Sequence, residues 1–135
     1  MSRALRLDPL IADKVEEHQE ELARKAEKLA RGAGSNKEGQ LRNILAIAEE
    51  SRSWALVDLF MRYQAGRGQL DPDWTRKAIS ELEELKQLAK NIAQDRQQEV
   101  VGQVHLELVK RVLGYTIWWY VWLSKGESKG RGERS

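Results

Sequence analysis

The chain contains only two prolines, and each of them directly follows an aspartate, in the pairs Asp8-Pro9 and Asp71-Pro72. Proline breaks a helix in its interior but suits the first helical turn, where the preceding aspartate can cap free backbone N–H groups. The two pairs therefore predict two helix starts and leave the rest of the chain free of the strongest helix breaker. Leu, Ala, Glu, Lys, Arg and Gln dominate, and β-branched residues form no alternating run, so we expect helices and no sheet.

Apolar residues spaced three and four positions apart predict where the first three helices lie. The first helix is expected over residues 9–31, and a glycine-rich stretch ends it. Ser35 and Glu38 form a capping-box pattern that predicts the start of a second helix, which kinks or breaks near residues 51–53. The third helix, roughly residues 53–65, has apolar residues on several sides, which predicts a central position in the fold.

Two more helices complete the predicted fold. The fourth begins at Asp71-Pro72, and the fifth covers about residues 98–123. We expect an all-α, single-domain bundle of about five helices. Residues 1–34 form the N-terminal helix and a glycine-rich linker, residues 35–124 form the bundle core, and residues 125–135 form a disordered basic tail without apolar side chains.

Several kinds of chemistry lack the residues that they need. The chain has no cysteine and two histidines, His18 and His105, neither of which is paired with a carboxylate at the spacing of a metal site. No glycine motif for nucleotide phosphates occurs, and the serines cluster at helix ends and in the tail, away from both histidines. We therefore expect no metal, no cofactor and no enzymatic activity, and we predict that the protein works by binding.

The location of the protein is predicted from two further features. The absence of cysteine fits the reducing conditions of the cytoplasm. The longest uncharged apolar stretch, residues 114–123, is about half of what a bilayer span needs. We expect a cytoplasmic protein that does not enter a membrane.

Basic and acidic residues are nearly balanced, 23 against 21, so any surface that attracts nucleic acid must be local. Isolated basic residues near the expected helix ends are the candidates, because guanidinium groups at the edges of a bundle suit phosphate contacts. These candidates are Arg42, Arg52, Arg62, Arg67, Lys110 and Arg111. The alternative is that they are ordinary solvated side chains.

Five aromatic residues lie within eight positions of the last predicted helix, between Tyr115 and Trp122. At 100° per residue they cannot all face one side: Tyr115, Trp119 and Trp122 share the apolar stripe, while Trp118 and Tyr120 project elsewhere. This pattern is typical either of a helix buried on most sides or of a contact surface for another subunit. On the second interpretation, Trp118, Tyr120 and Trp122 are the candidate interface residues. A membrane-surface anchor would need more basic residues on this helix than it has.

Three segments together resemble the small helical subunit of type III-A CRISPR effector complexes, the second of the Csm proteins. They are residues 35–45 (SNKEGQLRNIL), 56–67 (LVDLFMRYQAGR) and 106–120 (LELVKRVLGYTIWWY). Met61-Arg62 stands where the family usually has proline, and the tryptophans of the last segment stand where it has smaller residues. The resemblance is therefore also compatible with a divergent type III relative. The comparable small subunit of type III-B complexes is an alternative.

The resemblance implies a non-catalytic subunit that stacks in several copies along the CRISPR RNA and its target, either RNA or single-stranded DNA. Its partners would be other effector subunits and further copies of itself. Arg42 and Arg67 match arginines of the family motifs and would contact the nucleic-acid backbone. Four further candidates for the same contacts come from charge and placement alone and not from the resemblance: Arg52, Arg62, Lys110 and Arg111. The alternative is a helical protein–protein adaptor or dimerisation module that binds no nucleic acid.

Overall fold

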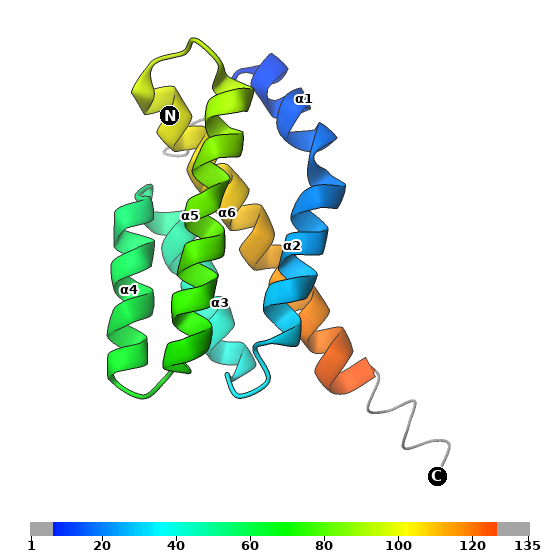
Figure 1. The fold of residues 1–135 in the computed structure, drawn as a ribbon, viewed down its shortest axis with the longest axis vertical. Coiled ribbons are helices and arrows are strands. Elements are labelled where there is room, and N and C mark those ends of the chain that lie inside the picture. Colours follow the sequence, from blue (N-terminus) through cyan, green and yellow to red (C-terminus); the bar gives the residue numbers. More distant parts are fainter. Residues whose placement is uncertain (1–6, 127–135) are drawn as a thin grey trace.

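The structure is a computed structural model that describes residues 7–126, and in this range it consists of α-helices and one π-helical turn, with no strand (Figure 1). The predicted all-α class is confirmed. Six α-helices are present within the described residues, where the sequence predicted about five. Lys125 and Gly126 belong to the π-helical turn η1 (Trp122–Gly126), and the rest of the predicted disordered tail lies outside the described residues.

The first predicted helix is two helices, α1 (Pro9–Glu17) and α2 (Gln19–Arg31), separated at His18. The start is as predicted: Pro9 opens α1, and the Asp8 carboxylate accepts a hydrogen bond of 2.8 Å from the backbone N–H of Leu10. The prediction of a single long helix was wrong because the polar His18 and Gln19 interrupt the apolar stripe. The break allows α1 to pack on α5 and α6 while α2 packs mainly along α6.

The helix α3 (Glu38–Ser51) starts near the predicted position but without the predicted capping box. Lys37 occupies the capping position, and its side chain makes no capping bond. The Glu38 carboxylate instead binds Arg42 and Lys125. The predicted break near residues 51–53 is present. Arg52 ends α3 with a left-handed backbone (φ 57°), which explains why the chain turns sharply there.

The helix α4 (Trp54–Gly66) lies at the edge of the bundle, so the predicted central position was wrong (Figure 1). It packs on α3 and α5 with Val57 and Met61 facing inward, while Leu56, Leu59 and Tyr63 are exposed. Its apolar residues cover more than the one side that the bundle buries. Hydrophobicity on several sides of a helix therefore did not mark the centre of this fold.

The central helix is α6 (Gln98–Val121), which runs diagonally behind α5 (Pro72–Ala93) and packs against α2, α3 and α5 (Figure 1). The predicted cap of α5 is confirmed, since the Asp71 carboxylate accepts a hydrogen bond of 2.8 Å from the N–H of Trp74. The indole N–H of Trp74 donates to the carbonyl of Leu29 at 2.9 Å. This bond joins the start of α5 to the end of α2.

Candidate interaction surfaces

An open groove of about 730 Å³ lies between α2 and the last turns of α6. On its α6 side are Trp122 and the pair Tyr115 and Trp118, whose ring centroids are 5.7 Å apart. Trp118 is 73% exposed and Trp122 is 53% exposed. Isolated exposed apolar residues are ordinary, but an apolar groove lined by several aromatic rings is typical of a binding surface. The residues of this aromatic groove are Gln19, Glu20, Ala23, Tyr115, Trp118, Trp119 and Trp122.

Trp119 is the most tightly held aromatic side chain of the aromatic groove. It is half-buried, and its indole N–H donates a hydrogen bond of 3.1 Å to the backbone carbonyl of Ala23 on α2. A tryptophan N–H that leaves water needs such an acceptor, so the bond stabilises the contact between α2 and α6. Trp119 therefore belongs to the fold, while Trp118 and Trp122 face outward.

Tyr120, the third predicted interface residue, has a different position. It is half-buried, and its hydroxyl donates a hydrogen bond of 2.6 Å to the backbone carbonyl of Asn36, in the loop before α3. The predicted inward stripe holds for Trp119 but not for Trp122, because several sides of α6 are covered. Residues off the stripe, such as Thr116 and Ile117, are buried as well.

Arg111 and Lys110, predicted as nucleic-acid contacts, are held by carboxylates. The Arg111 guanidinium lies 2.6 Å from the Glu16 carboxylate and 2.9 Å from that of Glu107, and Lys110 lies 3.6 Å from Glu107. Burial alone would lower the pKa of Arg111, but its hydrogen bonds to Glu107 and Glu16 outweigh burial and raise that pKa. Arg111 thus joins α6 to α1, and its charge is already compensated.

Arg42 and Arg62 each bind a carboxylate one helical turn earlier. The distances are 2.8 Å from Arg42 to Glu38 and 2.6 Å from Arg62 to Asp58. Such exposed pairs contribute little stability, so a phosphate could displace the carboxylate at small cost. They do, however, reduce the positive potential around each guanidinium.

Arg67 has no carboxylate partner among the described residues. It caps α4, its guanidinium lies over the ring of Tyr63 at 5.4 Å from the centroid, and it donates a hydrogen bond of 3.1 Å to the amide oxygen of Gln64. Gln64 is buried, and its own amide donates to Gln40 of α3 at 3.0 Å. The next residue, Gly68, has φ +81°, a left-handed conformation that ends the helix just beyond Arg67.

The structure brings three of the candidates, Arg42, Arg62 and Arg67, towards one end of the α3–α4 hairpin and places Arg52, Lys110 and Arg111 elsewhere. Gln40 and Gln64, which join the two helices, lie close in sequence to Arg42 and Arg67 respectively. Arg52 is exposed at the opposite end of the hairpin and, like Lys110, lines a second groove of about 530 Å³. That groove contains as many acidic as basic side chains, so it does not favour an anion. Its charged residues are Glu49, Arg52, Lys86, Glu99, Glu107 and Lys110.

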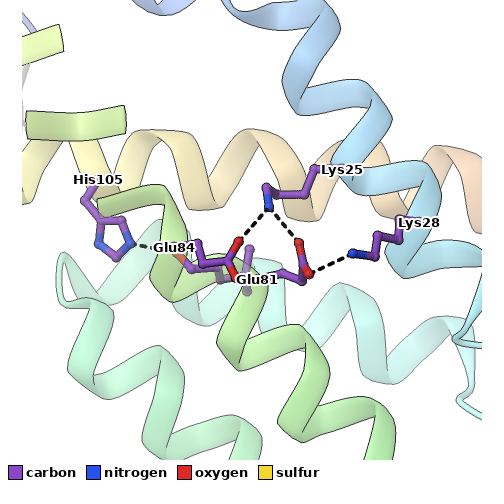
Figure 2. Close-up of polar contacts among 6 residues, drawn as sticks. Lys25, Lys28, Glu81, Glu84 and His105 are labelled. Carbon is purple, nitrogen blue, oxygen red and sulfur yellow. Dashed lines mark hydrogen bonds and ion pairs between the residues drawn. The ribbon is translucent and has the colours of Figure 1, made fainter. Parts of the chain in front are cut away.

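His105 also lines the second groove and is a core residue. Only 2% of it is exposed, and its Nε2–H donates to the backbone carbonyl of Leu82 at 2.9 Å (Figure 2). Its ring meets the ring of Trp54 edge-on, with centroids 5.3 Å apart. Burial lowers the pKa of His105, so the neutral imidazole is favoured at pH 7.

A partly buried ion-pair cluster joins α2 to α5, and sequence reasoning did not identify it (Figure 2). Lys25 lies 2.6 Å from Glu81 and 3.6 Å from Glu84, and Lys28 lies 3.0 Å from Glu81. A hydrogen bond from Lys25, and then one from Lys28, lowers the pKa of Glu81. The pairs join residues more than 50 positions apart, a separation at which no local pattern indicates contact.

Other kinds of site were sought in the same residues. Among residues 7–126, no three His, Asp or Glu side chains gather as they would around a metal ion. No helix in that range is long and apolar enough to span a bilayer. Comparisons with protein-family models, with curated proteins and with solved structures found no match.

Proposed function

We propose that this chain is a non-catalytic small subunit of a type III CRISPR effector complex, the assembly that its sequence resembles. In this proposal several copies lie along the CRISPR RNA and its target, and each copy contacts the nucleic-acid backbone weakly. Weak contacts suffice because copies held in one assembly add their contributions.

The observation that carries the proposal is the arrangement around Arg67. Its guanidinium is exposed, free of carboxylate partners among the described residues, and held in one direction by Tyr63 and Gln64. A guanidinium fixed in this way loses little conformational freedom when it binds a phosphate. Of the six basic candidates, Arg67 is the one that best combines accessibility with a fixed orientation.

The spatial relation of two resembling segments supports the same proposal. Residues 35–45 and 56–67 are separate in sequence, yet the hydrogen bond between Gln64 and Gln40 joins them directly. Their motif arginines, Arg42 and Arg67, therefore belong to one end of one hairpin. Two phosphate contacts at one end of a hairpin lie nearer to each other along a strand than contacts at opposite ends would.

The test is a reconstituted type III complex that contains Arg67→Ala in every copy of this subunit. We expect weaker binding of guide and target RNA and a smaller dependence of affinity on salt, because fewer counterions are released. The matched control is Arg24→Ala, an exposed arginine of α2 that is paired with Glu20. Unchanged affinity and salt dependence in a complex carrying both Arg42→Ala and Arg67→Ala would show the proposal to be wrong.

The second candidate function is a protein–protein adaptor that binds no nucleic acid, and the aromatic groove favours it. Exposed tryptophans contribute disproportionately to protein interfaces. An adaptor would lose its partner with Trp118→Ser and keep it with Arg67→Ala. An effector subunit that contacts nucleic acid would lose RNA affinity with Arg67→Ala.

A further inference from the structure

The second groove contains a buried ring nitrogen that the described fold does not use. The groove lies between the end of α3, the start of α4 and residues 99–110 of α6, and its volume of about 530 Å³ suits one small molecule. His105 lines it, and the Nε2–H of His105 is bonded to the carbonyl of Leu82. The other ring nitrogen, Nδ1, forms no hydrogen bond with a described residue, and Figure 2 shows it pointing away from the bond to Leu82.

Nδ1 of His105 can be reached from the groove, although only 2% of the residue is exposed. Within residues 7–126, the one fully enclosed side-chain nitrogen or oxygen without a hydrogen-bond partner belongs to Asn36. Nδ1 also has no partner, so it is not enclosed, and the second groove is the opening that His105 lines. Burial lowers the pKa of His105, so at pH 7 the ring is neutral and Nδ1 is a hydrogen-bond acceptor. The groove therefore offers a fixed acceptor to a donor group of a ligand.

The charged side chains of the second groove are acidic on balance once their ion pairs are counted. Lys86 is paired with Glu83 at 2.7 Å. Lys110 belongs, with Glu107, to a network of two acids and two bases whose charges cancel. Three charged side chains of the groove form no ion pair with a described residue, and two of the three are acids. They are Arg52, Glu49 and Glu99. A cationic donor is therefore favoured over an anion.

The groove also has an apolar wall, and a glycine leaves space beside it. Trp54 and Leu106 line the groove, and the ring of Trp54 meets the ring of His105 edge-on. Outside its own helical turn, no atom lies within 4 Å of the position that a Cβ would take at Gly102. Packing therefore does not require a glycine there, although glycine weakens the interior of a helix relative to alanine. The missing side chain leaves room in the groove.

We propose that the second groove binds a small organic amine with an apolar body. The protonated amino group donates a hydrogen bond to Nδ1 of His105 and is attracted by the carboxylates of Glu49 and Glu99. The apolar body packs on Trp54 and takes the space beside Gly102. A carboxylate or phosphate ligand would find no donor at Nδ1. The proposal goes beyond the proposed function, because neither arginine of the resembling motifs lines this groove.

The test titrates the full chain at pH 7 with two probes that share a phenyl ring. Phenethylamine is a protonated amine at this pH, and phenylpropionate is its counterpart with a carboxylate. Calorimetry measures the affinity, and the ¹⁵N resonance of Nδ1 reports whether this nitrogen accepts a hydrogen bond. We expect phenethylamine to bind and to move the resonance of Nδ1, and we expect phenylpropionate to do neither.

Two sets of variants separate binding from folding. Gly102→Met fills the groove with a good helix former, so it should abolish the binding of phenethylamine without lowering the melting temperature. Its control is Gly39→Met, at an exposed glycine of α3 that is equally free of neighbours and lies outside the groove. Glu49→Gln combined with Glu99→Gln should weaken binding about tenfold. Its control is Glu50→Gln, an exposed neighbour that does not line the groove.

Three results would overturn the proposal. The first is an unaltered protein that does not bind phenethylamine. The second is equal affinity for the two probes, which would mean that apolar contact alone holds them. The third is unchanged affinity in Gly102→Met, which would place the probe elsewhere on the protein. None of these results affects the test of RNA binding with Arg67→Ala, so the two proposals fail separately.

Discussion

The hydroxyl of Tyr120 near the end of α6 donates a hydrogen bond of 2.6 Å to the backbone carbonyl of Asn36, in the loop between α2 and α3. Tyr120→Phe removes this donor and should lower the free energy of unfolding by about 1 kcal/mol. Chemical denaturation measures the loss. Tyr63→Phe is the control, because Tyr63 is exposed and its hydroxyl bonds no described residue. Equal effects of the two substitutions would contradict a structural role for Tyr120.

The loop before α3 offers a second prediction, because the structure replaces the expected cap at Ser35 by a buried amide at Asn36. The Asn36 side-chain oxygen accepts a hydrogen bond of 2.8 Å from the backbone N–H of Asp71, at the start of α5. Asn36→Ala should therefore destabilise the fold by about 2 kcal/mol. Ser35→Ala, at an exposed position, should change stability by less than about 0.5 kcal/mol. Stability is measured by urea titration. A larger loss with Ser35→Ala than with Asn36→Ala would favour the capping box.

The ion-pair cluster between α2 and α5 predicts a dependence of stability on acid pH. The pKa of Glu81 lies below its ordinary value of 4.5 because Lys25 and Lys28 bind its carboxylate. Its contribution is therefore complete above about pH 4.5 and is lost as the pH falls through the lower pKa of the folded state.

Glu81→Gln should accordingly destabilise the protein by about 1.5 kcal/mol at pH 7, and the difference should shrink below pH 4.5. The control is Glu84→Gln, because Glu84 is more exposed and lies 3.6 Å from Lys25. Unfolding is followed at several pH values. A stability difference between the unaltered protein and Glu81→Gln that grows as the pH falls would contradict this prediction.

The buried side chain of His105 predicts a second change in stability with pH, at higher pH than the change due to Glu81. Burial lowers its pKa below the ordinary value of 6.5, so between pH 6.5 and the folded-state pKa the unfolded chain binds a proton that the folded chain does not. Stability should fall as the pH drops through this range. From pH 6.5 to pH 5 the loss is at most about 2 kcal/mol for one group. The substitution His105→Gln should remove this dependence of stability on pH, whatever its effect on stability at neutral pH. A dependence that persists in the variant would mean that a different group binds the proton.

Local signals in the sequence located most helix ends. The aspartate before each proline caps a helix as predicted, and the chain turns at Arg52, within the predicted break at residues 51–53. Each of these depends on side chains within a few positions of one another. The cap at Ser35 failed because Asn36 binds Asp71, 35 positions away. A long-range partner replaced the local one.

The arrangement of the helices was less predictable, since both α4 and α6 have apolar residues on several sides. Which of them becomes central depends on how the other helices pack, and no property of either segment alone decides it. The same limit applies to the site. The sequence placed Trp118 off the apolar stripe but left open whether it is buried or exposed, and it could not show that Tyr120 turns inward or that Arg111 is held by Glu16.

The hydrogen bond between Trp119 and Ala23 has a kinetic consequence for whatever enters the aromatic groove. It joins the two walls before a partner arrives, so no opening step has to precede association. The rate of encounter should then depend on diffusion and mutual orientation, which gives association rate constants of roughly 10⁵–10⁷ M⁻¹ s⁻¹. Substitutions of Trp118 should therefore act mainly on how long a complex lasts rather than on how fast it forms.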